Sequence, residues 1–173
     1  MVPPYYIKID LENYDHVILM ELFRNNIYPK YLSAESHSID IFALLVTFGR
    51  YTSFNLVDGA SVSSLYANHT INTFDTVKSY SFPYHSAGPF GEDVKGPWMA
   101  PNDFFRHLAI EQLGWKDIHA TKEIQPEVTA PVYSMHGLLR EAKLTAMSFL
   151  RENAPAVFEI LKKLRGLTGR RPD

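Results

Sequence analysis

The chain has 173 residues, 46% of them hydrophobic and 21% charged, a length that suits one ordinary domain and a composition that argues against wholesale disorder. Its formal net charge of −2 excludes a strong overall attraction to nucleic acid, and the lack of cysteine excludes disulfides, thiolate metal sites and thiol nucleophiles. Because no apolar run approaches the roughly 20 residues that span a bilayer, and no signal-type core opens the chain, we expect a soluble, cytoplasmic protein that binds neither nucleic acid nor membrane.

The first part of the chain alternates between strand patterns and helical apolar stripes, which is typical of an α/β fold. The crossover between the first two strands takes about 20 residues, the size of a right-handed βαβ unit. We therefore expect a mostly parallel sheet with flanking helices. The predicted elements are a strand over Tyr6–Asp10, a helix over Asp15–Arg24, a strand over Lys30–Ala34, a helix from the N-cap Ser38 to a left-handed Gly49, and a strand over Thr52–Val57.

The second part has fewer regular signals. Residues 60–80 suggest a hairpin or an irregular excursion, and residues 81–101 contain too many prolines and glycines for regular structure. A loop of that length is usually functional or disordered, and its aromatic residues argue against disorder. A helix capped by Asn102 and a short strand over Trp115–Thr121 should follow. The tail should form two helices, the second opening at Pro155 after Asn153 as its cap.

Acidic side chains follow the first two predicted strands. Asp10, Glu12 and Asp15 follow the first strand, and Glu35 with His37 follows the second. Neighbouring parallel strands lie about 4.8 Å apart, so we expect these groups in one small site. They suit a general base, an acceptor for a cationic or amino-bearing ligand, or a hard-metal site. The structural alternative is that they cap a helix or face solvent.

Several segments resemble one enzyme family. YIKIDLENYDHVILMELF, PKYLSAESHS and GRYTSFNLVDG, in that order, are similar to the FkbM-type methyltransferases, S-adenosylmethionine-dependent enzymes with a Rossmann-like sheet. Members typically show a strand reading I-K-I-D-x-E-G-x-E, followed by a strand that ends in an acid. SAGPFGEDVKGPW and GWKDIHA resemble a subset of the family, so the likeness covers roughly residues 5–120.

The chain departs from the family pattern in three places. Asn13 replaces a glycine, although asparagine tolerates a left-handed backbone, and Asp15 replaces a glutamate. The family's glycine-rich turn and ribose-binding acid, which grip the cofactor, would lie upstream of Met1. The resemblance therefore implies the C-terminal portion of a Rossmann-like methyltransferase domain over residues 1–122, truncated or split, with a helical tail over residues 123–173.

The resemblance also implies roles for particular residues. Asp10 and Asn13 would border S-adenosylmethionine, which this chain alone is expected to bind weakly or not at all. The carboxylates and His37 would serve catalysis, namely methyl transfer to a hydroxyl of a sugar or secondary metabolite. The expected catalytic residues are Asp10, Glu12, Asp15, Glu35 and His37, and the expected acceptor-binding residues are His85, Glu92, Asp93 and Trp98.

Two other functions compete with this hypothesis. The chain would be a non-catalytic α/β interaction module if it has lost cofactor binding, with its helical tail as the contact surface. It would be a metal-dependent hydrolase if Asp10, Glu12, Glu35 and His37 held a cation, but their spacing matches no metal motif. A sheet without its first strands exposes an apolar edge, so we expect a missing N-terminal half or a second copy as partner, besides a small-molecule acceptor.

Overall fold

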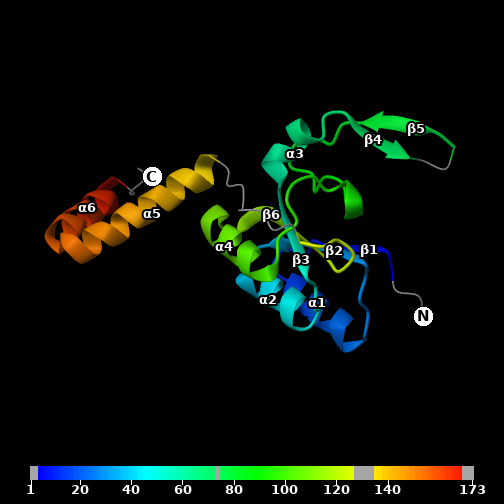
Figure 1. Ribbon diagram of the computed structural model, residues 1–173, viewed down its shortest axis with the longest axis horizontal. Helices are drawn as coiled ribbons and strands as arrows, with labels where there is room; N and C mark the ends of the chain where they lie inside the picture. Colours follow the sequence, from blue (N-terminus) through cyan, green and yellow to red (C-terminus); the bar gives the residue numbers. More distant parts are fainter. Residues whose placement is uncertain (1–3, 73–74, 127–134, 169–173) are drawn as a thin grey trace. The chain divides into compact units, whose positions relative to one another are not determined.

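The computed structural model describes residues 4–72, 75–126 and 135–168 and divides into two units, Met1–Val132 and Tyr133–Asp173. The first unit is an α/β fold and the second is a pair of helices (Figure 1). The division falls after residue 132, whereas the sequence analysis placed it after residue 122.

The first unit contains a four-stranded sheet in the order β1-β2-β6-β3. β1 (Tyr6–Ile9) pairs in parallel with β2 (Tyr31–Ser36), and β6 (Gly114–Thr121) lies antiparallel between β2 and β3 (Ser53–Asp58). β1, β2 and β3 therefore run in one direction, but two of the three pairings are antiparallel. The expectation of a mostly parallel sheet is wrong because β6, distant in sequence, separates β2 from β3.

One face of the sheet is apolar. In strands, alternate residues point to opposite faces, and the register aligns Leu32 of β2 with Ile7, Ala120 and, beyond it, Phe54. The helices α1 (Asp15–Arg24), α2 (Ile39–Thr47) and α4 (Pro101–Glu111) gather on one side of these strands (Figure 1). Their contributions to the same core cluster are Leu19, Phe23, Ile41, Phe42, Leu45, Phe104 and Leu108.

The opposite face is polar yet largely buried. Lys8 aligns with Ser33, which aligns with His119, which aligns with Asn55, so one polar residue comes from each strand. Ser33, His119 and Asn55 are at most 3% exposed. Part of the loop that follows residue 81 covers this face, since the backbone oxygen of Lys95 accepts a 3.4 Å hydrogen bond from Asn55. Burial lowers the pKa of His119 to about 3, so this imidazole is neutral.

The helix ends follow local capping chemistry, with one correction. Ser38 caps α2 as expected by accepting a 3.1 Å hydrogen bond from the Asp40 backbone. Asp58 caps the short α3 (Gly59–Leu65) in the same way at 2.9 Å. Asn102 is not the cap of α4, because that helix begins with Pro101, a residue whose fixed backbone angle suits the first helical position.

Gly49 follows α2 but is not the left-handed residue that the sequence suggested. The left-handed residue is Arg50, with φ of 55°. Gly49 is needed for space instead: a Cβ there would lie 2.7 Å from the Leu45 carbonyl oxygen, 2.7 Å from the Tyr51 ring and 2.8 Å from the Phe23 ring. The missing side chain lets the end of α2 pack closely against α1.

The remaining elements complete both units. β4 (His69–Asn72) and β5 (Val77–Tyr80) form a hairpin, one of the two predictions for this segment, and a single 3-10 turn, Gly91–Asp93, lies within the long loop. The second unit consists of α5 (Met135–Asn153) and α6 (Pro155–Thr168), and Pro155 opens α6 as expected. Asn153 instead ends α5, where its amide donates to the Phe149 carbonyl. None of the described helices has the length and hydrophobicity needed to cross a bilayer.

Gly49→Ala should destabilise the first unit by about 1–3 kcal/mol, because the added methyl group overfills a packed site. Urea unfolding followed by circular dichroism measures the change. Gly59→Ala is the matched control: its Cβ would meet nothing closer than 3.4 Å, so the midpoint should move little. Equal stability of the two variants would contradict the packing role of Gly49.

Candidate functional site

A cavity of about 600 Å³ lies where β1 and β2 end, where β3 passes into α3 and where β6 begins. Because β6 is antiparallel, its first residues share this edge of the sheet with the carboxyl ends of the other strands. Ligands of open α/β sheets bind at that edge. The cavity is therefore where the sequence analysis placed a functional site.

The turn after β1 brings Asp10, Glu12 and Asn13 to the cavity. Asn13 has φ of 77° and Glu12 has φ of 40°, so both are left-handed. The sequence analysis anticipated this conformation for Asn13 but not for Glu12, whose side chain makes it less favourable. Asp15 supports the turn from behind: its Oδ1 accepts a 2.8 Å hydrogen bond from the Leu11 backbone. Asp15 is 1% exposed and does not line the cavity.

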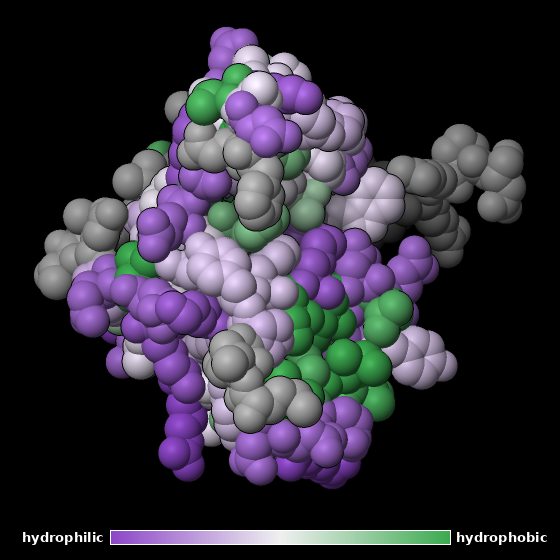
Figure 2. Space-filling model, turned by 90° about the vertical axis from the view of Figure 1, so that its right-hand side faces the viewer, coloured by the Kyte–Doolittle hydropathy of each residue, from purple (hydrophilic) through white to green (hydrophobic). Residues whose placement is uncertain are grey.

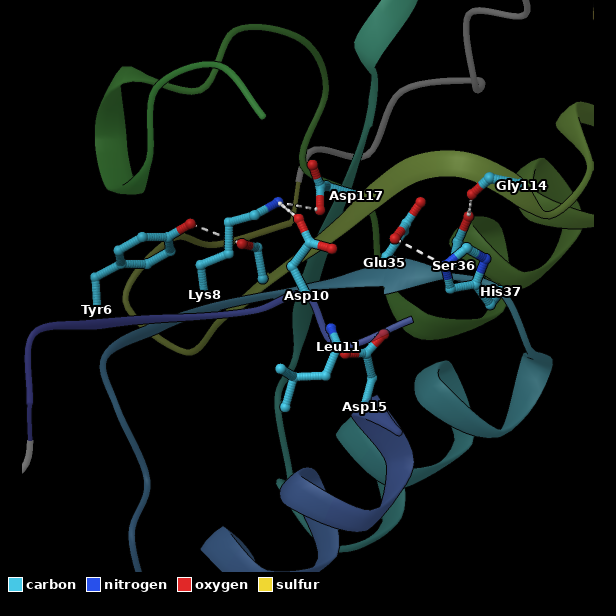
Figure 3. Close-up of polar contacts among 11 residues, drawn as sticks. Tyr6, Lys8, Asp10, Leu11, Asp15, Glu35, Ser36, His37, Gly114 and Asp117 are labelled. Atoms are coloured by element: carbon cyan, nitrogen blue, oxygen red, sulfur yellow. Dashed lines mark hydrogen bonds and ion pairs between the residues drawn. The ribbon is translucent and has the colours of Figure 1, made fainter. Parts of the chain in front are cut away.

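The end of β2 supplies Glu35 and His37 to the same cavity. His37 Nε2 lies 2.7 Å from Glu35 Oε2, a close contact without the alignment of a hydrogen bond (Figure 3). The pairing of β2 with β6 shifts after Glu35, and the Ser36 hydroxyl donates to the Gly114 carbonyl at 3.0 Å. Burial raises the pKa of Glu35, His37 lowers it, and the like charge of Asp10 raises it, with a net increase.

An ion-pair network that was not expected from the sequence joins the edge strand β1 to β6, across β2. Lys8 Nζ lies 2.9 Å from Asp117 Oδ1 and 3.4 Å from Asp10 Oδ2 (Figure 3). Burial raises the pKa of Asp117, Lys8 lowers it and Asp10 raises it, and the net shift is upward. Lys8 lies two residues before Asp10, so strand alternation already placed them on one face. Asp117 carried no such signal, because its position depends on the insertion of β6.

The long loop contributes one of its predicted residues. The His85 backbone donates to the Gly59 carbonyl at 3.0 Å, which ties residues 85–87 to the start of α3, and His85 lines the cavity. The loop does not bring the other three predicted residues there. Their contacts lie elsewhere: Glu92 is 3.4 Å from the Tyr31 hydroxyl, Asp93 is 3.7 Å from His69, and Trp98 is packed in a core cluster with Val57, Val62, Tyr66 and Val94.

The other aromatic wall of the cavity comes from β6. Trp115 lines the cavity, is 69% exposed, and meets His85 edge to face with ring centroids 5.0 Å apart. Lys116, its neighbour, also lines the cavity, but its ammonium group lies 2.5 Å from the Glu111 carbonyl oxygen and 3.5 Å from the Glu111 carboxylate. Trp115 is thus the large side chain that remains open to a ligand.

These groups suit proton transfer and recognition of a polar ligand. Glu35, with a raised pKa and a neighbouring imidazole, has the environment of a general base or acid. Among the described residues, no group of three or more histidine or acidic side chains is placed to hold a metal ion. The arrangement suits two of the roles expected from the sequence, a general base and an acceptor for a cationic or amino-bearing ligand.

Asp10→Asn should lower the pKa of Glu35, because it removes a neighbouring like charge. Carbon-13 NMR of the carboxyl groups measures this shift, and Glu21→Gln, on the exposed Arg24 pair, is the control. Since folding raises the pKa of Glu35 and Asp117, the unfolded state releases these protons more readily. The two groups therefore lower the free energy of unfolding as pH rises from their unfolded toward their folded pKa. An unchanged Glu35 pKa in Asp10→Asn would contradict the described geometry.

No family model, no curated protein and no solved structure matches this chain.

Proposed function

We propose that this chain is the C-terminal portion of an FkbM-type S-adenosylmethionine-dependent methyltransferase that methylates a hydroxyl of a sugar or secondary metabolite. The observation that carries the proposal is that six of the ten residues selected by the family resemblance line one cavity. Asp10 and Asn13, expected beside the cofactor, and Glu35 and His37, expected at the acceptor, come from two neighbouring strand ends and line the same space.

The sheet supports a partial Rossmann-like architecture. β1, β2 and β3 run in the same direction and each is followed by a helix, and one antiparallel strand is compatible with doubly wound sheets. β1 is an edge strand: among the described strands it pairs only with β2. The side of the molecule that lies to the right in Figure 1 bears a hydrophobic patch (Figure 2), and Leu11, which follows β1, is exposed. Further strands of a larger sheet would pair there.

The cavity residues divide the chemistry of methyl transfer between them. When bound, S-adenosylmethionine would supply the methyl group: the acceptor oxygen would bond to the methyl carbon as the bond from carbon to sulfur breaks, and a base would take the hydroxyl proton. Glu35 and His37 are the candidates for this base, since they touch each other and lie at the cavity wall. Asp10 would place negative charge near the positive sulfonium group of a bound cofactor. The turn from β1 to α1 has no glycine-rich sequence, so the proposal assigns contact with the adenosine part of the cofactor to a separate segment.

Calorimetric titration tests the cofactor side of the proposal. The isolated chain should bind S-adenosylmethionine weakly, with Kd near or above about 1 mM, because no glycine-rich turn follows β1 to approach the ribose of the cofactor. Micromolar affinity would overturn the view that a second segment is needed.

The catalytic side is tested on the chain joined to, or mixed with, the segment encoded directly upstream, by following labelled methyl groups. Glu35→Gln should reduce transfer by about 100-fold or more, whereas the exposed Glu21→Gln should leave it unchanged. Absence of transfer to any hydroxylated acceptor by the combined protein would refute the methyltransferase proposal.

A second candidate function, a protein-interaction module, is favoured by the unit of α5 and α6. Leu139 and Phe149 of α5 and Ile160 of α6 are 65%, 63% and 58% exposed, and apolar helix stripes normally pack against another element. The expected partner is a second copy of the chain.

Light scattering should detect a dimer or larger species at micromolar concentration, and Phe149→Asp should shift it toward monomer. Ser148→Asp is the matched control, because it adds the same charge at an exposed position of the same helix that does not line the groove of Phe149. A wild-type chain that stays monomeric at all concentrations would argue against this function.

A further inference from the structure

We propose that the cavity at the strand ends binds an amino-bearing, polyhydroxylated ligand, that is, an amino sugar or aminocyclitol, with its ammonium groups on the carboxylates and its ring against Trp115. The inference deepens the proposed function, on which it rests for the view that this ligand is the methyl acceptor. Binding itself requires only the geometry of the cavity.

The cavity wall carries more negative than positive charge. Four carboxylates line it, those of Asp10, Glu12, Glu35 and Asp117, against the ammonium groups of Lys8 and Lys116. Both lysines are already engaged: Lys8 is shared by Asp117 and Asp10, and Lys116 contacts Glu111, which does not line the cavity. The wall is therefore left with an excess of negative charge.

A buried carboxylate adds to this excess. Asp15 is 1% exposed, and its Oδ2 has no hydrogen-bond partner among the described residues. Figure 3 shows its side chain rising from the start of α1 toward the turn that carries Asp10. Its negative charge acts on Asp117, since Asp15 contributes to the raised pKa of that residue. An incompletely paired buried carboxylate is costly, and a cationic ligand in the adjoining cavity would offset that cost.

The cavity also has an aromatic wall. Trp115 presents an indole that is 69% exposed, supported by His85 at a centroid distance of 5.0 Å. An exposed indole face stacks on sugar rings and attracts cations. Carboxylates accept hydrogen bonds from hydroxyl and ammonium groups alike. A ligand that is both hydroxylated and cationic would hydrogen-bond to the carboxylates and stack on Trp115.

The same charges define what the cavity should reject. A phosphorylated or carboxylated sugar would bring an anion beside Asp10, Glu35 and Asp117, where the available ammonium groups are already paired. A volume of about 600 Å³ lies in the range of pockets that hold drug-sized ligands, so a compound of two linked rings fits it better than a single small amine.

Fluorescence titration with neamine, a pseudodisaccharide that carries four amino groups, tests the inference in the absence of cofactor. The chain has two tryptophans, Trp98 at 5% exposure and Trp115 at 69%, so quenching by a cavity ligand reports on Trp115. Neamine should bind at least tenfold more tightly than its tetra-N-acetyl derivative, which keeps the rings but loses the charges. Binding should also weaken with added salt.

Variants locate the binding site. Asp10→Asn and Glu35→Gln should each weaken neamine binding by about tenfold, measured by calorimetry as well as by fluorescence, and Glu21→Gln should not change it. Trp115→Phe should remove the fluorescence response. The inference would be overturned by equal affinity for neamine and its acetylated derivative or by no binding of either. It would also be overturned if Asp10→Asn and Glu35→Gln left the affinity for neamine unchanged.

The outcomes also separate this inference from the proposed function. Because the titration contains no cofactor, failure of methyl transfer leaves a positive neamine result standing. Conversely, the combined protein could transfer methyl groups to a neutral or anionic acceptor while the chain fails to bind neamine. That result would refute the proposed ligand class but leave the methyltransferase function standing.

Discussion

The acidic edge of the sheet depends on one ammonium group. Lys8 reaches across β2 from β1 to contact Asp117 of β6, and it contacts Asp10 at the end of its own strand. Burial lowers the pKa of Lys8, but Asp117 and Asp10 raise it more, so the lysine stays charged. Without it, Asp117 would be a nearly buried carboxylate beside two others, an arrangement that costs several kcal/mol per unpaired ion. Lys8 thus allows acids from three strands to share a cavity.

The two faces of the sheet are covered by different parts of the chain. The apolar face packs α1, α2 and α4 and supplies most of the core, while the polar face is covered by the long loop and, at the end of β3, by α3, since Val62 and Tyr66 cluster with Val57. Phe90 of that loop stacks on Tyr6 with ring centroids 4.4 Å apart and planes 6° apart. The loop is therefore partly structural, as a cover, and partly functional, because residues 85–87 reach the cavity.

Much of the fold was predictable because its signals are local. Strand alternation and helical stripes located β1, α1, β2, α2 and β3, and Ser38 showed a capping residue directly. Two expectations about helix ends were wrong. Asn102 is not a cap because α4 already begins at Pro101. Gly49 is not left-handed, and a glycine is needed there because a side chain would collide with its neighbours.

The site was predictable only where it depends on parallel neighbours. Asp10 and Glu35 could be expected together, since β1 and β2 are joined by one crossover. Asp117 and Trp115 could not, because their place depends on which strands β6 pairs with and in which direction. That pairing is a long-range property, set by burial of Ile118 and Ala120 in the common core and by no local pattern.

The position of β6 also has a consequence for synthesis of the chain. β2 and β3 have no pairing with each other, so until Gly114–Thr121 leaves the ribosome the growing protein carries two separate, unpaired strand edges that await one late segment. Closure over so large a sequence separation is slow, and open edges invite aggregation meanwhile. A chaperone that shields the nascent strands should therefore raise the yield of native protein more than a faster rate of translation would.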